Sequence, residues 1–130
     1  MTEPEWILPE VAIAVHQMVL AEHGGLSGLR DDGLLESTLI RPRQRFAYEA
    51  DVSIFELAAS YAYGIARNYP FVDGNKRMAL SLAAVFLEIN GYSLRAPEPE
   101  AAMIFTRLAS GEVTEDQLTA WIRNSYTERA

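Results

Sequence analysis

The residues best suited to chemistry lie in one run of nine, Tyr69-Pro70-Phe71-Val72-Asp73-Gly74-Asn75-Lys76-Arg77. A glycine-containing loop here leads directly into a strongly apolar stretch that is predicted to be helical. The first N–H groups of a helix lack partners within the helix, and its dipole is positive at that end, so an anion is favoured. Gly74 permits close backbone approach, and Asn75 can cap the helix or orient a ligand.

Lys76 and Arg77 add two cations to the same helix start. Cations oppose the dipole at a helix N-terminus, so their presence is easier to explain if a polyanion binds between them. Asp73 supplies a carboxylate that could bind Mg²⁺ or orient a nucleophile. The loop alone leaves a second interpretation open, in which Asp73 is an ordinary N-cap and the two cations are simply hydrated.

The remaining sequence predicts an all-α domain of about six helices, with residues 1–130 forming a single domain. Proline, glycine and two capping boxes, at Ser53/Glu56 and Thr114/Gln117, mark the ends of the apolar periodic stretches. The stretch at 75–89 is apolar on nearly all faces, which predicts a buried central helix. The expected helices cover about 9–23, 33–40 (ended by Pro42), 53–70, 75–89, 100–109 and 114–126.

Residues 40–48 have a different pattern. Arg41, Arg43 and Arg45 alternate with Pro42 and Gln44. In an extended chain this spacing places three cations on one face, so a short β-like flap is expected there. A solvated loop is the alternative.

Composition excludes several classes of protein. The chain has no cysteine and only two histidines, which excludes a disulfide scaffold and a thiolate or histidine-rich metal centre. A net charge of −7 argues against direct nucleic-acid binding. No apolar run is long enough for a membrane span and the N-terminus is acidic, so a cytoplasmic protein is expected.

The nine-residue loop resembles the signature of the Fic/Doc family, His-x-Phe-x-Asp/Glu-x-Asn-x-Arg followed by a helix. Phe71, Asp73, Asn75 and Arg77 match it in register, and Lys76 resembles the death-on-curing branch, where most Fic proteins have glycine. The likeness extends to residues 23–29, 33–48 and 90–92, and covers about four-fifths of the chain.

This resemblance implies a compact helical domain that uses ATP and Mg²⁺ to modify a protein hydroxyl. Fic proteins usually transfer AMP, whereas death-on-curing toxins phosphorylate a threonine of elongation factor Tu and arrest translation. The resemblance implies that Asp73 assists Mg²⁺ or base positioning, that Gly74 and Asn75 form the anion cradle, and that Lys76 and Arg77 bind phosphates. It also implies that 41–48 is the flap that presents the target chain, with Arg41, Arg43 and Arg45 on it.

The sequence departs from the family at Tyr69, where the signature has the histidine that accepts the proton of the attacking hydroxyl. Tyrosine ordinarily titrates near 10, so about one side chain in a thousand is ionised at neutral pH. General-base catalysis contributes a factor of about 10² to 10⁴ in rate. Because Tyr69 should lose most of this contribution, impaired catalysis is expected. Neither His16 nor His23 is expected to replace it. Two explanations of Tyr69 are open. It is either a change that silences a toxin or the residue of a natural variant, and such a variant would be a nucleotide-binding pseudoenzyme or an enzyme with altered chemistry.

The expected partners also follow from the resemblance. No inhibitory Ser/Thr-x-x-x-Glu-Gly/Asn helix is present, and death-on-curing toxins are inhibited by an antitoxin whose C-terminal segment folds onto them. A phosphoryl-transferring toxin with such an antitoxin is therefore the leading hypothesis. The alternatives are an adenylyl transferase acting on a protein hydroxyl, and a non-catalytic module that binds nucleotide or a partner.

Overall fold

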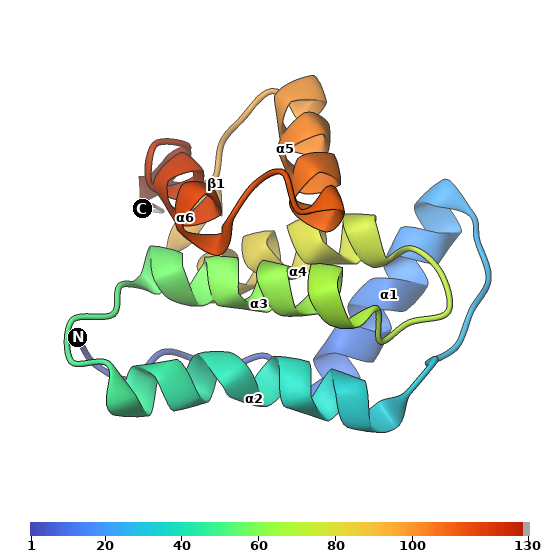
Figure 1. The fold of residues 1–130 in the computed structure, drawn as a ribbon, viewed down its shortest axis with the longest axis horizontal. Helices are drawn as coiled ribbons and strands as arrows, with labels where there is room; N and C mark the ends of the chain where they lie inside the picture. The colour runs from blue at the N-terminus through green and yellow to red at the C-terminus, as the bar shows by residue number, and fades with distance from the viewer. Residues whose placement is uncertain (129–130) are drawn as a thin grey trace.

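A computed structural model describes residues 1–128, and its fold is almost entirely helical (Figure 1). Six helices and two short strands follow one another along the described chain: α1 Pro9–His23, α2 Asp32–Tyr48, α3 Ile54–Asn68, α4 Asn75–Ile89, β1 Tyr92–Leu94, α5 Glu98–Ser110, α6 Glu115–Arg123 and β2 Tyr126–Glu128. The prediction of an all-α domain of about six helices is confirmed. Within residues 1–128, no helix combines the length and the apolarity that crossing a bilayer requires.

Local sequence signals explain most of the helix ends. Pro9 occupies the first turn of α1, and Gly24 ends that helix with φ +76°. The two predicted capping boxes are both formed, by Ser53 with Glu56 at α3 and by Thr114 with Gln117 at α6. Each satisfies N–H groups that a helix start leaves without partners.

Helix α3 lies at the centre of the fold, packed between α2 and α4, with α5 and α6 over one side (Figure 1). Ten of its 15 residues are buried, whereas six of the 15 in α4 are. The helix at 75–89 is therefore only partly the buried centre that the sequence predicted. Gly64 allows α2 and α3 to approach closely, because a Cβ on it would lie 2.8 Å from the Thr38 methyl carbon.

The extended flap expected at 40–48 is not present, because α2 continues through Pro42 to Tyr48. Pro42 is buried on the core face of this helix, and packing outweighs the backbone hydrogen bond that proline removes. The two strands lie elsewhere and were not predicted. β1 and β2 pair antiparallel, with Ser93 opposite Thr127, and the rings of Phe55, Tyr92 and Tyr126 pack together beside them.

The loop between α3 and α4 lies at one end of the molecule, next to the segment that joins α1 to α2 (Figure 1). An antiparallel bridge between Leu29 and Phe71 joins the two, and the Val72 N–H donates to the Gly28 carbonyl at 3.0 Å. Two segments that are far apart in sequence therefore form one surface at the start of α4.

Candidate active site

The signature loop, residues 69–77, is fixed from within by two of its own residues. Phe71 is buried and anchors the loop in the core. Asn75 brackets the backbone of Phe71: its side-chain oxygen accepts from the Phe71 N–H at 3.1 Å, and its nitrogen donates to the Phe71 carbonyl at 2.9 Å. Asn75 thus holds the turn that starts α4.

Tyr69 ends α3 in a left-handed conformation, φ 48° and ψ 55°. It is the one non-glycine residue in 1–128 with a positive φ, which costs on the order of 1–3 kcal/mol and is a feature of functional sites. Arg30 stabilises the turn, donating to the carbonyls of Tyr69 at 2.7 Å and Asn68 at 2.6 Å. The Tyr69 side chain is 44% exposed, and its hydroxyl has no hydrogen-bond partner among the described residues.

Asp73 is the carboxylate of the site, and two backbone N–H groups orient it. One of its oxygens accepts from Leu26 at 3.1 Å and the other from Gly74 at 2.9 Å. These bonds, the one from Leu26 foremost, lower the pKa of Asp73 below that of an ordinary aspartate. Asp73 is therefore an ionised group at neutral pH, and it precedes the N-cap position, which Gly74 occupies.

The start of α4 carries two cations that form no ion pair within residues 1–128. Its first turn has no acidic residue, and the N–H groups of Asn75, Lys76 and Arg77 have no acceptor within residues 1–128. The side chains of Lys76 and Arg77 are exposed, and no ion pair joins either one to another described residue. An anion at this position would gain two cations, several N–H donors and the helix dipole.

Two hollows adjoin this helix start. The first, of about 370 Å³, is lined by Tyr69, Val72 and residues 73–77, so the structure brings every residue predicted for catalysis and phosphate binding to one surface. The second, of about 200 Å³, lies between α4 and α5. It shares Lys76 and Arg77 with the first, and its other lining residues are Leu80, Glu98, Ala102, Phe105 and Thr106.

The arginines predicted for the flap lie apart from this surface. Arg41 and Arg45 are one helical turn apart on α2 and both bind Glu115 on α6, Arg41 through two hydrogen bonds of 2.7 and 2.8 Å. Arg41 also donates to Ser60, which precedes Tyr69 on α3 by about 13 Å of helix. Arg45 also pairs with Glu49 and Glu56. The expectation of three cations on one exposed face is wrong.

Arg43 lies on another face of α2, with its guanidinium 5.9 Å from the Trp6 ring. The alternation of the three arginines suggested an extended chain. Positions 41 and 45 are four residues apart, however, and are therefore also neighbours on the surface of a helix. The contacts of Arg41 and Arg45 are those of a structural ion-pair cluster.

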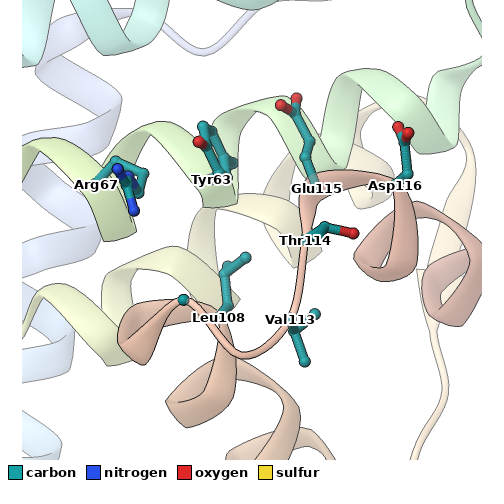
Figure 2. Close-up of a pocket in the computed structure, with 8 residues that line it drawn as sticks. Tyr63, Arg67, Leu108, Val113, Thr114, Glu115 and Asp116 are labelled. Atoms are coloured by element: carbon teal, nitrogen blue, oxygen red, sulfur yellow. The ribbon is translucent and has the colours of Figure 1, made fainter.

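A further hollow, of about 310 Å³, lies between α3 and the connection from α5 to α6. Figure 2 shows Tyr63 and Arg67 of α3 facing the segment that carries Thr114 and Glu115. None of its lining residues belongs to the signature loop. It therefore forms no part of the candidate active site.

Sequence reasoning missed the residues that support the loop from outside it. These are Arg30 beneath Tyr69, the 25–26 backbone beside Asp73, and His16, whose ring nitrogen lies 2.9 Å from the Asp73 carbonyl oxygen. A β-carbon at position 25 would lie 2.9 Å from an Asp73 oxygen, and the backbone there has φ +122°, so glycine is required. The Gly24-Gly25 pair could have indicated a position with a special backbone conformation. A single histidine in a helix gave no such indication.

A resident metal centre made of protein ligands alone is absent from residues 1–128, which contain no group of three or more histidine, aspartate or glutamate side chains suited to one. The donor set does fit Mg²⁺ that arrives with a nucleotide. Mg²⁺ is commonly bound through one or two carboxylates and substrate phosphates, and Asp73 is an ionised, exposed carboxylate beside the anion cradle.

The fold and the site define an all-helical domain that presents an anion-binding loop at the start of a helix. The sequence model of the Fic/DOC family matches residues 6–87, most of the chain, and the chain belongs to this family. It is similar to "Protein kinase doc" of Escherichia phage P1, with 37% identity over 92% of this chain and 94% of that protein. It is also similar to "Toxin Doc" of Mycolicibacterium smegmatis, with 40% identity over 56% of this chain and 57% of that protein.

Proposed function

We propose that this chain is a Doc-type toxin whose site transfers the γ-phosphoryl group of ATP to a protein hydroxyl. The observation that supports this best is that Lys76 and Arg77 form no ion pair within residues 1–128 and lie at a helix start, next to the ionised Asp73. A triphosphate with Mg²⁺ matches both features. The similarity to a protein named as a kinase favours phosphoryl transfer.

In the proposed complex, the N–H groups at the start of α4 and the side chains of Lys76 and Arg77 bind the phosphates. The second hollow, between α4 and α5, takes the nucleoside, because it shares those two cations and adds the apolar side chain of Leu80. Asp73 would hold Mg²⁺, which supplies charge neutralisation of the phosphates when it is bound. Asn75 maintains the loop that makes these positions possible.

The transfer step forms a bond between the target oxygen and the γ-phosphorus and breaks the bond from that phosphorus to the β–γ bridging oxygen, so ADP leaves. The hydroxyl proton passes to the side chain at position 69, which in the family is histidine. The backbone at this position favours that assignment, because histidine is among the residues that adopt the left-handed region most readily. With Tyr69, proton acceptance is inefficient, and this form of the chain is catalytically impaired.

The target hydroxyl would enter beside Tyr69, where the side chains of Leu26 and Val72 are also exposed. The extended segment that borders the loop is residues 26–30, paired with 71–72, rather than residues 40–48. We therefore transfer the proposed role of the flap to residues 26–30. A threonine of elongation factor Tu remains the proposed target, with arrest of translation as the result, in the cytoplasm and under the control of an antitoxin.

Two alternatives use the same cradle. Adenylyl transfer needs the α-phosphorus, rather than the γ-phosphorus, next to the target hydroxyl. A non-catalytic module would use the cradle to bind nucleotide or a partner, and the tyrosine at position 69 is the observation that favours it.

The test compares this chain with its Tyr69→His variant in the presence of Mg²⁺, purified elongation factor Tu and ATP labelled in the γ- or the α-phosphate. We expect the variant alone to transfer label, and only from γ-labelled ATP. Transfer from α-labelled ATP would establish adenylyl transfer instead. A Tyr69→His/Asp73→Asn variant is the matched control and should be inactive. No transfer by any form, to this target or to proteins of a cell extract, would exclude the enzyme and favour the binding module.

A further inference from the structure

His16 is a buried polar side chain for which the proposed reaction gives no role. It lies on the core face of α1 and is 2% exposed. Its ring stacks on Phe71, with ring centres 4.0 Å apart and planes 20° apart. Its Nε2 lies 2.9 Å from the carbonyl oxygen of Asp73. A carbonyl only accepts hydrogen bonds, so Nε2 carries a proton and donates it.

This bond acts on the peptide that joins Asp73 to Gly74. The peptide is planar and trans, so its N–H points away from its C=O. With the carbonyl directed at His16, the Gly74 N–H is directed the opposite way, where it donates to an Asp73 carboxylate oxygen at 2.9 Å. The other carboxylate oxygen accepts from Leu26. The orientation of the carboxylate is thus coupled to the hydrogen bond that His16 makes.

Packing alone does not account for a histidine at this position. Val19, one turn further along α1, also lies beneath Gly74, at 3.8 Å from a Cβ built there, and it fills space without a polar group. A buried polar side chain is costly unless it is hydrogen-bonded, so an apolar residue would serve packing better. What His16 adds is a donor aimed at one backbone carbonyl.

We propose that His16 is a positioning residue, which orients the Asp73 carboxylate and the adjoining anion cradle by donating its Nε2 proton to the Asp73 carbonyl. This inference rests on the proposed function, since it gives His16 a role in that reaction. His16 is not a catalytic residue, because it lies beneath the loop, whereas the phosphates and the target hydroxyl would bind above it.

The first test measures transferase kinetics in the Tyr69→His background. His16→Phe keeps a ring against Phe71 and removes the donor, while His16→Gln restores a side-chain N–H of similar reach. We expect His16→Phe to lower kcat about tenfold to a hundredfold, as expected for a misplaced catalytic group. We expect His16→Gln to recover most of that loss. Val19→Ala is the packing control and should lower the melting temperature while leaving kcat within about twofold.

Equal kcat values for the phenylalanine and glutamine variants would overturn the proposal, because the donor would then be irrelevant. A loss of kcat in Val19→Ala as large as in His16→Phe would also overturn it, because packing would then explain the effect.

The second test does not depend on catalysis and uses the chain with Tyr69. Hydrogen exchange of the Gly74 and Leu26 amides is measured by NMR, together with that of the α3 amides as a reference. We expect His16→Phe to speed exchange at Gly74 and Leu26 about tenfold and to leave α3 unchanged, and His16→Gln to restore the slow exchange. Unchanged exchange in His16→Phe would refute the proposal. If the Tyr69→His parent proves inactive, the proposed function fails. The exchange measurement still shows whether the hydrogen bond of His16 orients the Asp73 carboxylate.

Discussion

The ion-pair cluster around Glu115 should stabilise the fold, and removing this one carboxylate should be costly. Glu115 accepts two hydrogen bonds from Arg41 and one from Arg45, at 2.7 to 3.0 Å. Its side chain is 16% exposed, that of Arg45 is 17% exposed and that of Arg41 is 39% exposed. Glu115→Ala therefore leaves one largely buried and one partly buried guanidinium without this partner.

The magnitude follows from that exposure. Removing one partner of a fully buried ion pair costs about 3–5 kcal/mol. Arg45 retains Glu49 and Glu56 as partners, and Arg41 is exposed enough to be hydrated again. The cost of leaving each guanidinium without Glu115 is therefore lower than in a fully buried pair. We expect Glu115→Ala to lower the free energy of unfolding by about 2–3 kcal/mol, and Glu115→Gln, which keeps an acceptor, by about half as much.

Urea unfolding followed by circular dichroism measures this loss. The matched control is Arg43→Ala, which removes an exposed guanidinium of the same helix that lies 5.9 Å from the Trp6 ring and forms no ion pair within residues 1–128, and it should cost about 0.5 kcal/mol. A loss below about 0.5 kcal/mol in Glu115→Ala would refute the structural role of the cluster. It would also reopen target binding as the role of Arg41 and Arg45.

Three further predictions concern single positions. Gly64→Ala should destabilise the protein by about 1–3 kcal/mol in urea unfolding, because its Cβ would lie 2.8 Å from the Thr38 methyl carbon; equal stability would show that α2 and α3 can separate freely. Gly25→Ala should weaken Mg²⁺-ATP binding about tenfold in calorimetry, because its Cβ would lie 2.9 Å from an Asp73 oxygen and displace the carboxylate; unchanged affinity would argue against Asp73 as the Mg²⁺ ligand.

The third concerns pH. The folded-state pKa of Asp73 is lowered, so its stabilising effect is present above the ordinary aspartate range and is lost as the pH falls through the folded value. The acid limb of Tyr69→His kinetics should therefore follow the histidine, near pH 6.5, and Asp73 should stay ionised throughout; an acid limb near pH 4 would contradict this.

Local signals predicted the helix ends well where a single residue decides them. Pro9 and Gly24 delimit α1, and Gly74 and Asn90 delimit α4, so both helices have the predicted bounds. The capping boxes were equally direct, because cap and partner are three residues apart. In each case the interaction that determines the end is contained in the local sequence.

The errors arose where a distant residue decides the structure. Residues 41–48 remain helical because α2 packs on α3 and because Glu115, 70 or more positions away, pairs with Arg41 and Arg45. The strand pair joins residues 92–94 to residues 126–128, and neither strand is long enough to show periodicity. His16 contacts Asp73 across 57 positions. No single stretch of sequence contains these pairings.

The candidate site was predictable because its components are consecutive. Residues 69–77 carry the carboxylate, the glycine and both cations. Because they are consecutive and lead into a helix, they lie on one surface without the help of contacts from distant segments. Arg30 and Leu26, which orient that loop, could not be identified, since their roles depend on a bridge between two distant segments.

The most direct test of the site is a calorimetric titration of the unaltered chain, with Tyr69 in place, with Mg²⁺-ATP, beside its Lys76→Ala/Arg77→Ala variant. We predict that the unaltered chain binds one nucleotide and that the double variant binds at least about a hundredfold more weakly at an unchanged melting temperature, because charge-assisted contacts contribute about 1.5–3 kcal/mol each. Absence of binding by the unaltered chain, or equal affinity of the two forms, would show that the start of α4 is not a nucleotide site.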